Sequence, residues 1–208
     1  MAISTYSELK TAVANWINRD DLTDRIPEFI ALAEAQFNRE LRIRGMEGRY
    51  TADTVANQRN YMLPGGYIQM RNFQLNTSPI GALTYVTPEM YDRLWGGSTA
   101  GTPQMYTIVA NDILLGPVPA SVIEMEMDFY KDFDSLSSTV ASNWVLDNAP
   151  DVYLYGSLLN AEPFLMNDER VAVWSAFFEN AIKNINSADA RDRHSGSAMR
   201  VRNTSGYP

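Results

Sequence analysis

The hydrophobic period of the 208-residue chain changes twice along its length, and these changes constrain the fold more than any other feature. Up to about residue 46, apolar residues recur at steps of three and four, which is typical of amphipathic helices. From about residue 47 the pattern becomes extended and is interrupted by Gly and Pro, which indicates short strands and turns. From Pro150 the helical period returns. The sequence therefore predicts helices at both ends with a β region between them.

The N-terminal segment is expected to form two helices. Thr5 and Glu8 have the spacing of a capping box, which predicts that the first helix begins there. Pro27 suits the first turn of the second helix, because proline lacks an N–H group that the first turn would leave unpaired. We expect Gly45 to end this second helix.

The central region is expected to contain short strands and one short helix. Strands are predicted at residues 49–55, 67–75, 80–86, 104–109, 113–115 and 122–130. Pro88 to Leu94 should form the helix, and Asn111-Asp112 has the composition of a hairpin turn. Trp95 precedes two glycines, so we expect it to be the most exposed tryptophan, whereas the other tryptophans have the spacing of core residues.

Two further helices are expected after residue 149. The first should cover 150–165, and Asn167 can cap the second, whose first turn holds Asp168 and Glu169. The predicted fold class is α+β, a bundle of N- and C-terminal helices with an inserted antiparallel β region and an extended C-terminal arm. The corresponding segments are 1–46, 47–148, 149–194 and 195–208.

The charge of the chain argues against tight binding to nucleic acid. The formal net charge is −8, whereas proteins that grip phosphates gather Lys and Arg. There is no cysteine, and hence no disulfide or thiolate metal site. No apolar run approaches the roughly 18 residues of a membrane span, and the first residues lack the pattern of a signal peptide. We therefore expect a cytoplasmic protein without a membrane partner.

Common catalytic signatures do not occur in the sequence. Its single histidine, His194, lies near the C-terminal end, and the HExxH, GxSxG and phosphate-loop motifs are missing. We therefore expect neither a cofactor nor a metal ion.

Glu124, Glu126 and Asp128 form the most regular acidic pattern. They alternate with apolar residues, so they should share one face of a strand. A glycosidase needs two carboxylates at a suitable separation, but three acids without basic partners on an open face resemble neither such a pair nor a metal cage. We interpret them as a solvated face or, alternatively, as the wall of a channel through which DNA moves without adhering.

Four stretches of the chain carry a resemblance to a known family. They are TYSELKTAVANWINRDDLTDRIPEFIALAEAQFNRELR, TPEMYDRL, NWVLDNAPDVYLYGSLLNAEPFL and DERVAVWSAFFENAI, and together they extend over most of the chain. In this order they resemble the head-to-tail adaptors of short-tailed bacteriophages and prophages, which include the tail tubular and gatekeeper proteins.

The resemblance implies a structural protein, not an enzyme, that forms a twelve-membered ring between the portal and the tail. DNA would pass through the ring without specific binding. The partners would be the portal protein ring, the tail nozzle or tail fibre proteins, and further copies of the chain. The protein would be assembled in the host cytoplasm and reside in the neck of the virion.

The C-terminal arm is the portal contact that the resemblance implies. Its candidate residues are the arginines Arg191, Arg193, Arg200 and Arg202, with Val201 and Tyr207 as apolar anchors. Mere solvation of the arm is the alternative. Two other functions stay open on the sequence alone: a tail-associated wall-degrading enzyme that uses acids of the β region, and a receptor-binding module suggested by its tyrosines.

Overall fold

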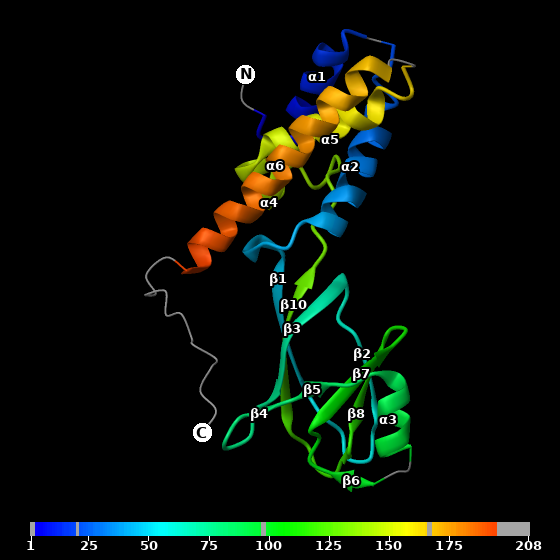
Figure 1. Cartoon of the computed structure of the whole chain (residues 1–208), viewed down its shortest axis with the longest axis vertical. Helices are drawn as coiled ribbons and strands as arrows, with labels where there is room; N and C mark the ends of the chain where they lie inside the picture. The colour runs from blue at the N-terminus through cyan, green and yellow to red at the C-terminus, as the bar shows by residue number, and fades with distance from the viewer. Residues whose placement is uncertain (1–2, 20, 97–98, 166–167, 195–208) are drawn as a thin grey trace, which may run out of the picture. The chain divides into compact units, whose positions relative to one another are not determined.

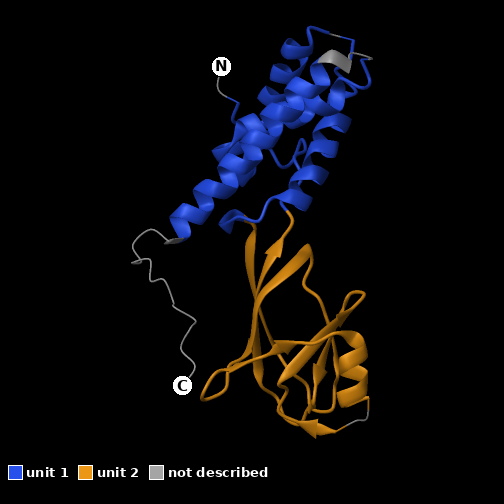
Figure 2. Cartoon of the chain, in the orientation of Figure 1, with its two compact units in different colours: residues 1–45, 133–208 blue, residues 46–132 orange. Residues whose placement is uncertain are grey.

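The computed structural model describes residues 3–19, 21–96, 99–165 and 168–194 (Figure 1). The chain divides into two compact units, which Figure 2 shows in different colours. The helical unit combines Met1–Gly45 with Phe133–Pro208, and the β unit consists of Met46–Asp132. The expected α+β class is confirmed, since helices come from both ends of the chain and strands from its middle.

The helical unit contains α1 (Tyr6–Ile17), α2 (Ile26–Glu40), α4 (Trp144–Asn148), α5 (Pro150–Ala161) and α6 (Asp168–His194), and a short 3-10 turn, η1 (Arg44–Met46), follows α2. The capping box of α1 is confirmed, because Thr5 Oγ1 accepts from the Glu8 N–H at 3.3 Å and Glu8 accepts from the Thr5 N–H at 3.1 Å. The expectation that Gly45 ends α2 was wrong. The helix ends at Glu40, because Leu41 takes an extended backbone and buries its side chain completely.

Helix α5 lies beside both α2 and α6 in the helical unit (Figure 1). Gly156 allows this close approach, because a Cβ atom there would lie 3.0 Å from the Phe178 ring and 3.1 Å from Ala33. Phe37 of α2 meets Tyr153 of α5 edge to face at 4.7 Å and stacks on Phe178 of α6 at 6.0 Å. Close-packed aromatic side chains therefore hold the three helices together.

A buried polar network joins the segment before α4 to the helices. Glu34 accepts hydrogen bonds from the Leu136 N–H at 2.7 Å and from the Tyr153 hydroxyl at 3.0 Å. Asn143 donates to the same hydroxyl at 2.6 Å. Burial raises the pKa of Tyr153, and the nearby Glu34 carboxylate raises it further. Residues 133–148 therefore belong to the helical unit, whereas the expected β insertion extended to residue 148.

The β unit contains two four-stranded sheets and one short strand pair. The strands are β1 (Glu47–Asp53), β2 (Asn60–Met62), β3 (Tyr67–Leu75), β4 (Gly81–Ala82), β5 (Thr84–Tyr85), β6 (Ala100–Gly101), β7 (Met105–Val109), β8 (Asp112–Gly116), β9 (Val118–Pro119) and β10 (Glu124–Lys131). One sheet has the order β1-β10-β3-β4 and the other β2-β8-β7-β5, while β6 pairs with β9. Helix α3 (Pro88–Trp95) completes the β unit. The hydrophobic core of this unit includes Phe73, Ile113 and Met127.

The strand predictions agree best where the alternating pattern is long. Strand β3 has the expected bounds, but the strand expected at 80–86 is split into β4 and β5. Strands β2, β6 and β9 were not predicted, because two or three residues are too few to reveal a period. Most pairs are antiparallel as expected, but β5–β7 and β6–β9 are parallel. Val109 pairs with Asp112, so the hairpin turn is Ala110-Asn111, one residue earlier than expected.

The prediction that Trp95 is the most exposed tryptophan was wrong. Its ring packs over Gly116, where a Cβ atom would lie 2.6 Å from it, so Trp95 is half-buried. Trp16 of α1 is instead 48% exposed. The spacing of α1 predicted a core position for Trp16, and the structure places it on the surface of the helical unit.

Candidate functional site

The acidic residues of β10 lie on one face of the strand, as expected. Met125, Met127 and Phe129 are buried on its other face. β10 is an inner strand of its sheet, with β1 on one side and β3 on the other. Alternation along an inner strand therefore divides the sheet into an apolar core face and a polar face, which we call the acidic face.

The acidic face has a basic partner, contrary to expectation. Arg49 Nε lies 2.8 Å from Asp128 Oδ1, and Arg49 Nη1 lies 3.3 Å from Glu126 Oε1. Hydrogen bonding to Asp128 and the charges of Asp128 and Glu126 raise the pKa of Arg49. Asn76 donates to Glu124 at 2.8 Å. The sequence could not reveal these contacts, because they depend on the antiparallel register that pairs Arg49 with Asp128.

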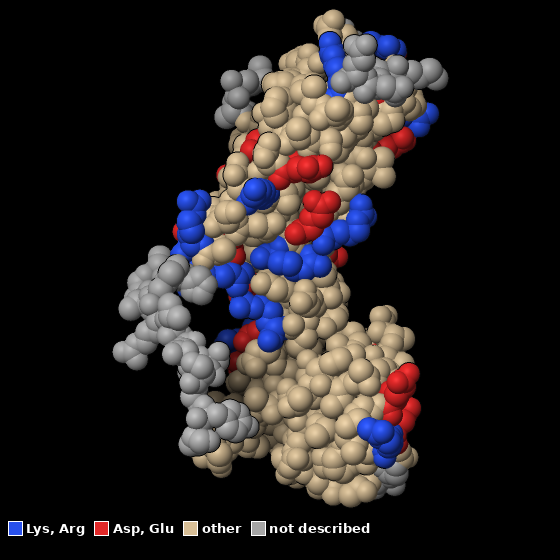
Figure 3. All heavy atoms as spheres, viewed as in Figure 1, with Lys and Arg blue, Asp and Glu red and all other residues tan. Residues whose placement is uncertain are grey.

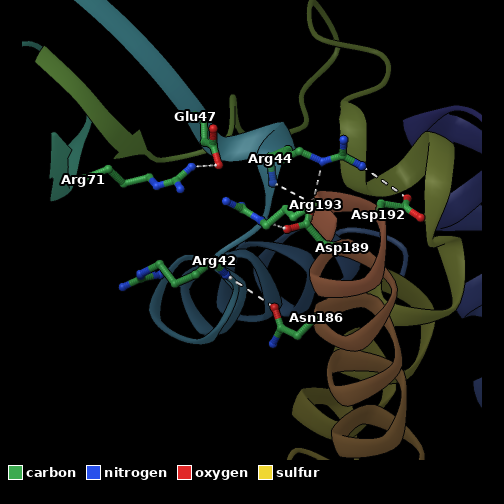
Figure 4. A network of polar contacts seen from close by, with 8 residues as sticks. All are labelled: Arg42, Arg44, Glu47, Arg71, Asn186, Asp189, Asp192 and Arg193. Atoms are coloured by element: carbon green, nitrogen blue, oxygen red, sulfur yellow. Dashed lines mark hydrogen bonds and ion pairs between the residues drawn. The ribbon is translucent and has the colours of Figure 1, made fainter. Parts of the chain in front are cut away.

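A second cluster lies where the segment after α2 meets the last turns of α6 (Figure 4). Asp189 is 8% exposed and accepts hydrogen bonds from the Arg44 N–H at 2.9 Å and from Arg44 Nε at 3.2 Å. It also accepts from Arg193 Nε, one turn further along α6. Arg44 reaches Asp192 at 3.2 Å as well. In Figure 3, acidic and basic side chains lie close together around the C-terminal ends of α2 and α6.

The charge state of Asp189 follows from these contacts. Burial opposes ionisation of the carboxyl group, but the Arg44 N–H and the guanidinium groups of Arg193 and Arg44 outweigh it, so the pKa of Asp189 is lowered. An ionised Asp189 therefore fixes the end of α6 to the segment that follows α2. Sequence reasoning missed this residue, although Asp189 and Arg193 have the i,i+4 spacing of a helical ion pair.

The predicted arm residues are only partly within the described chain. Arg193 is engaged by Asp189 of its own helix. Arg191 is exposed, and its Nε donates to the Ser187 carbonyl oxygen at 3.3 Å. Arg200, Val201, Arg202 and Tyr207 lie outside the described residues, as do Asn167, expected to cap α6, and the side chain of His194. The role of the six arm residues in portal binding stays a prediction: Arg191, Arg193, Arg200, Val201, Arg202 and Tyr207.

Aromatic side chains of three helices meet on the surface of the helical unit. We call this group the aromatic patch; it consists of Trp16 of α1, Tyr155 of α5, and Trp174 and Phe177 of α6. Trp16 lies 5.6 Å from Trp174, and Tyr155 lies 5.4 Å from Phe177. The Trp174 Nε1–H donates to buried Glu162 at 2.9 Å, which fixes its ring. Phe177 remains 46% exposed, so part of the patch faces solvent.

Within the described ranges, no group of three or more His, Asp or Glu side chains is arranged to hold a metal ion. No helix in the described part of the chain is both long and apolar enough to cross a membrane.

The exposed apolar side chains of the aromatic patch are typical of a structural subunit that acts by binding other proteins. Comparison with known families agrees with this class. The chain belongs to the SU10 adaptor protein family, whose model matches residues 4–202. This membership indicates a phage head–tail adaptor, a structural component of the virion. No match to the chain was found among curated proteins.

Proposed function

We propose that the protein is the subunit of a ring that joins the portal of a phage to its tail. The observation that carries the proposal is the family match over residues 4–202, which includes both units of the chain. The resemblance of the sequence to short-tailed phage adaptors supports a twelve-membered ring with a central DNA channel. In such a ring each copy contacts the portal on one side and the tail nozzle or tail fibre proteins on the other.

The C-terminal arm is the proposed portal anchor. Helix α6 carries the chain to His194, and Arg191 is exposed in its last turns. Arg200 and Arg202 follow in the sequence, with Val201 and Tyr207 as apolar contacts. Arginine side chains suit this role, because a guanidinium group can bind a partner's carboxylate through two parallel hydrogen bonds.

The acidic face is the candidate for the channel wall. Glu124, Glu126 and Asp128 outnumber the single Arg49 that pairs with them, so the face keeps a negative charge. A wall of this sign repels the phosphates of passing DNA and favours transit over adhesion. The rival enzymatic function has less support, because Glu126 and Asp128 share one guanidinium on a sheet face, an arrangement unlike the flanking pair of a glycosidase.

Three binding and activity measurements on the purified protein test the proposal. We expect it to cosediment with the portal protein of the same phage, to leave peptidoglycan intact, and to show no affinity for bacterial cells. Peptidoglycan turnover would indicate the wall-degrading alternative, and binding to cells without binding to portal would indicate a receptor-binding module. We expect the free protein to sediment as a monomer or weak oligomer, because the ring should close only on the portal. A stable closed ring without portal would contradict this expectation.

A further inference from the structure

The outward side of α6 carries a long stretch without charge. Its exposed residues between Arg170 and Arg191 on this side are Val173, Ala176, Phe177, Asn180, Asn184 and Ala188, which we call the α6 face. The charged residues Glu179 and Lys183 lie on another side of the helix, where they line a shallow groove next to Glu40 of α2. Small and amide side chains over four helical turns allow a second helix to approach closely.

The aromatic patch gives the α6 face an apolar end. Val173 is 47% exposed and Phe177 46% exposed, and they lie one turn apart on α6. Trp16 of α1, 48% exposed, packs against Trp174 and widens this end. Exposed apolar side chains gathered in this way mark protein interaction sites.

Helix α2 has a second uncharged surface. Its exposed residues between Glu28 and Arg39 are Ala31, Leu32 and Ala35, which we call the α2 face. Leu32 is 53% exposed, whereas the opposite side of α2 buries Ala33 and Phe37 against α5 and α6. The helical unit therefore presents two separate uncharged faces on two different helices.

The two faces lie at the same height along the bundle. Phe37 of α2 contacts Phe178 of α6, and the N–H of Arg42, two residues after the end of α2, contacts Asn186 further along α6, so α2 and α6 run in the same direction. With these contacts as reference points and an equal rise per residue, Leu32 is level with the stretch from Val173 to Phe177. In a ring, neighbours are related by rotation about one axis, so the surfaces that meet are different faces of the same chain. A bundle parallel to this axis brings faces of equal height together.

We propose that the α6 face of one subunit packs on the α2 face of a second copy of this chain, with Leu32 of one copy against Val173 and Phe177 of the other. This proposal rests on the ring proposed above. Even at the aromatic value of about 150–250 Å² per fully buried side chain, these three half-exposed side chains offer at most on the order of 300 Å² summed over both copies. A stable pair buries about 1,600 Å² summed over both partners. The contact is therefore too small to hold free subunits together and forms when the portal aligns them.

Cysteine cross-linking tests the contact directly, because the chain contains no cysteine of its own. Leu32→Cys and Phe177→Cys are made separately and together, and a short bismaleimide is added to each variant bound to the portal protein of the same phage. The double variant should give a ladder of covalent dimers, trimers and larger species. Each single variant should stay monomeric, because its thiol faces a surface of the neighbouring copy that carries no cysteine. The matched control is Leu32→Cys with Ala172→Cys, which places the second thiol on another exposed side of α6.

The outcomes distinguish refutation of the proposed contact from refutation of the proposed ring. Portal binding of the double variant without any ladder would overturn the proposed contact and leave the adaptor function standing. An equal ladder from the Ala172 control would also overturn it, as would strong dimers from Phe177→Cys alone, since that result indicates a two-fold contact between α6 faces. Absence of portal binding by the unaltered protein would refute the proposed function itself, and the contact with it.

Discussion

Replacing Asp189 by alanine should loosen the end of α6 and destabilise the helical unit by about 2–3 kcal/mol. Asp189 accepts hydrogen bonds from the Arg44 N–H, Arg44 Nε and Arg193 Nε while it is 8% exposed. Hydrogen bonds to a charged group contribute about 1.5–3 kcal/mol each, but they are not additive here. The Arg44 side chain is 51% exposed, so its guanidinium contact is screened and adds little.

Urea unfolding followed by circular dichroism measures this change, and hydrogen exchange of the last turns of α6 locates it. The matched control is Asp192→Ala, which removes the 66% exposed carboxylate that Arg44 also contacts. It should change stability by less than about 0.5 kcal/mol. An Asp189→Ala protein as stable as the Asp192→Ala control would refute the assignment of Asp189 as the anchor of α6.

The pH dependence of the same variants provides an independent check. The pKa of Asp189 is lower in the folded protein than in the unfolded chain, because the hydrogen bonds from Arg44 and Arg193 outweigh burial. Its contribution is therefore fully present above the unfolded pKa of about 4 and is lost as the pH falls through the folded value. The difference between the unaltered protein and Asp189→Ala should be constant from neutral pH to about pH 4 and shrink below it.

Three further changes test other parts of the account. Replacing Glu124, Glu126 and Asp128 together by Gln should cost no more than about 1 kcal/mol, since the Arg49 side chain is 64% exposed and solvent screens its ion pairs, and calorimetry should detect no tight calcium binding before or after the change; stoichiometric binding lost in the variant would contradict this. Deleting residues 195–208 should leave the melting temperature nearly unchanged and weaken portal binding, with a smaller dependence on salt; full portal binding would exclude the arm as the anchor. Gly156→Ala should destabilise the helical unit by about 1–3 kcal/mol in urea unfolding, because its Cβ would crowd the adjoining helices; a more stable variant would contradict the tight packing at that position.

Local signals in the sequence predicted much of the fold. The capping box of α1, the proline in the first turn of α2 and the bounds of β3 each depend on a few neighbouring residues. The errors have a common physical origin in contacts between distant segments. Burial of Leu41 ends α2 before Gly45, and pairing between strands creates the two-residue β6 and β9.

In the candidate site, too, local signals were predictable and contacts between distant segments were not. Alternation along β10 predicted which acids share a face, but only the register with β1 brings Arg49 to them. The role of Asp189 depends on a backbone N–H more than a hundred residues away, at Arg44. Trp16 has the spacing of a core residue, yet the helices around it leave it half exposed. The position of a side chain was predictable where it depends on one helix or strand. It was not predictable where it depends on the packing of several elements.

Electron cryomicroscopy of the neck of the intact phage shows directly whether this chain forms the ring between portal and tail. We expect a closed ring of this chain immediately below the portal, with the α6 face of each copy against the α2 face of the next and a negatively charged channel wall. Location of the chain at the tail tip, or its absence from the neck, would contradict the adaptor function.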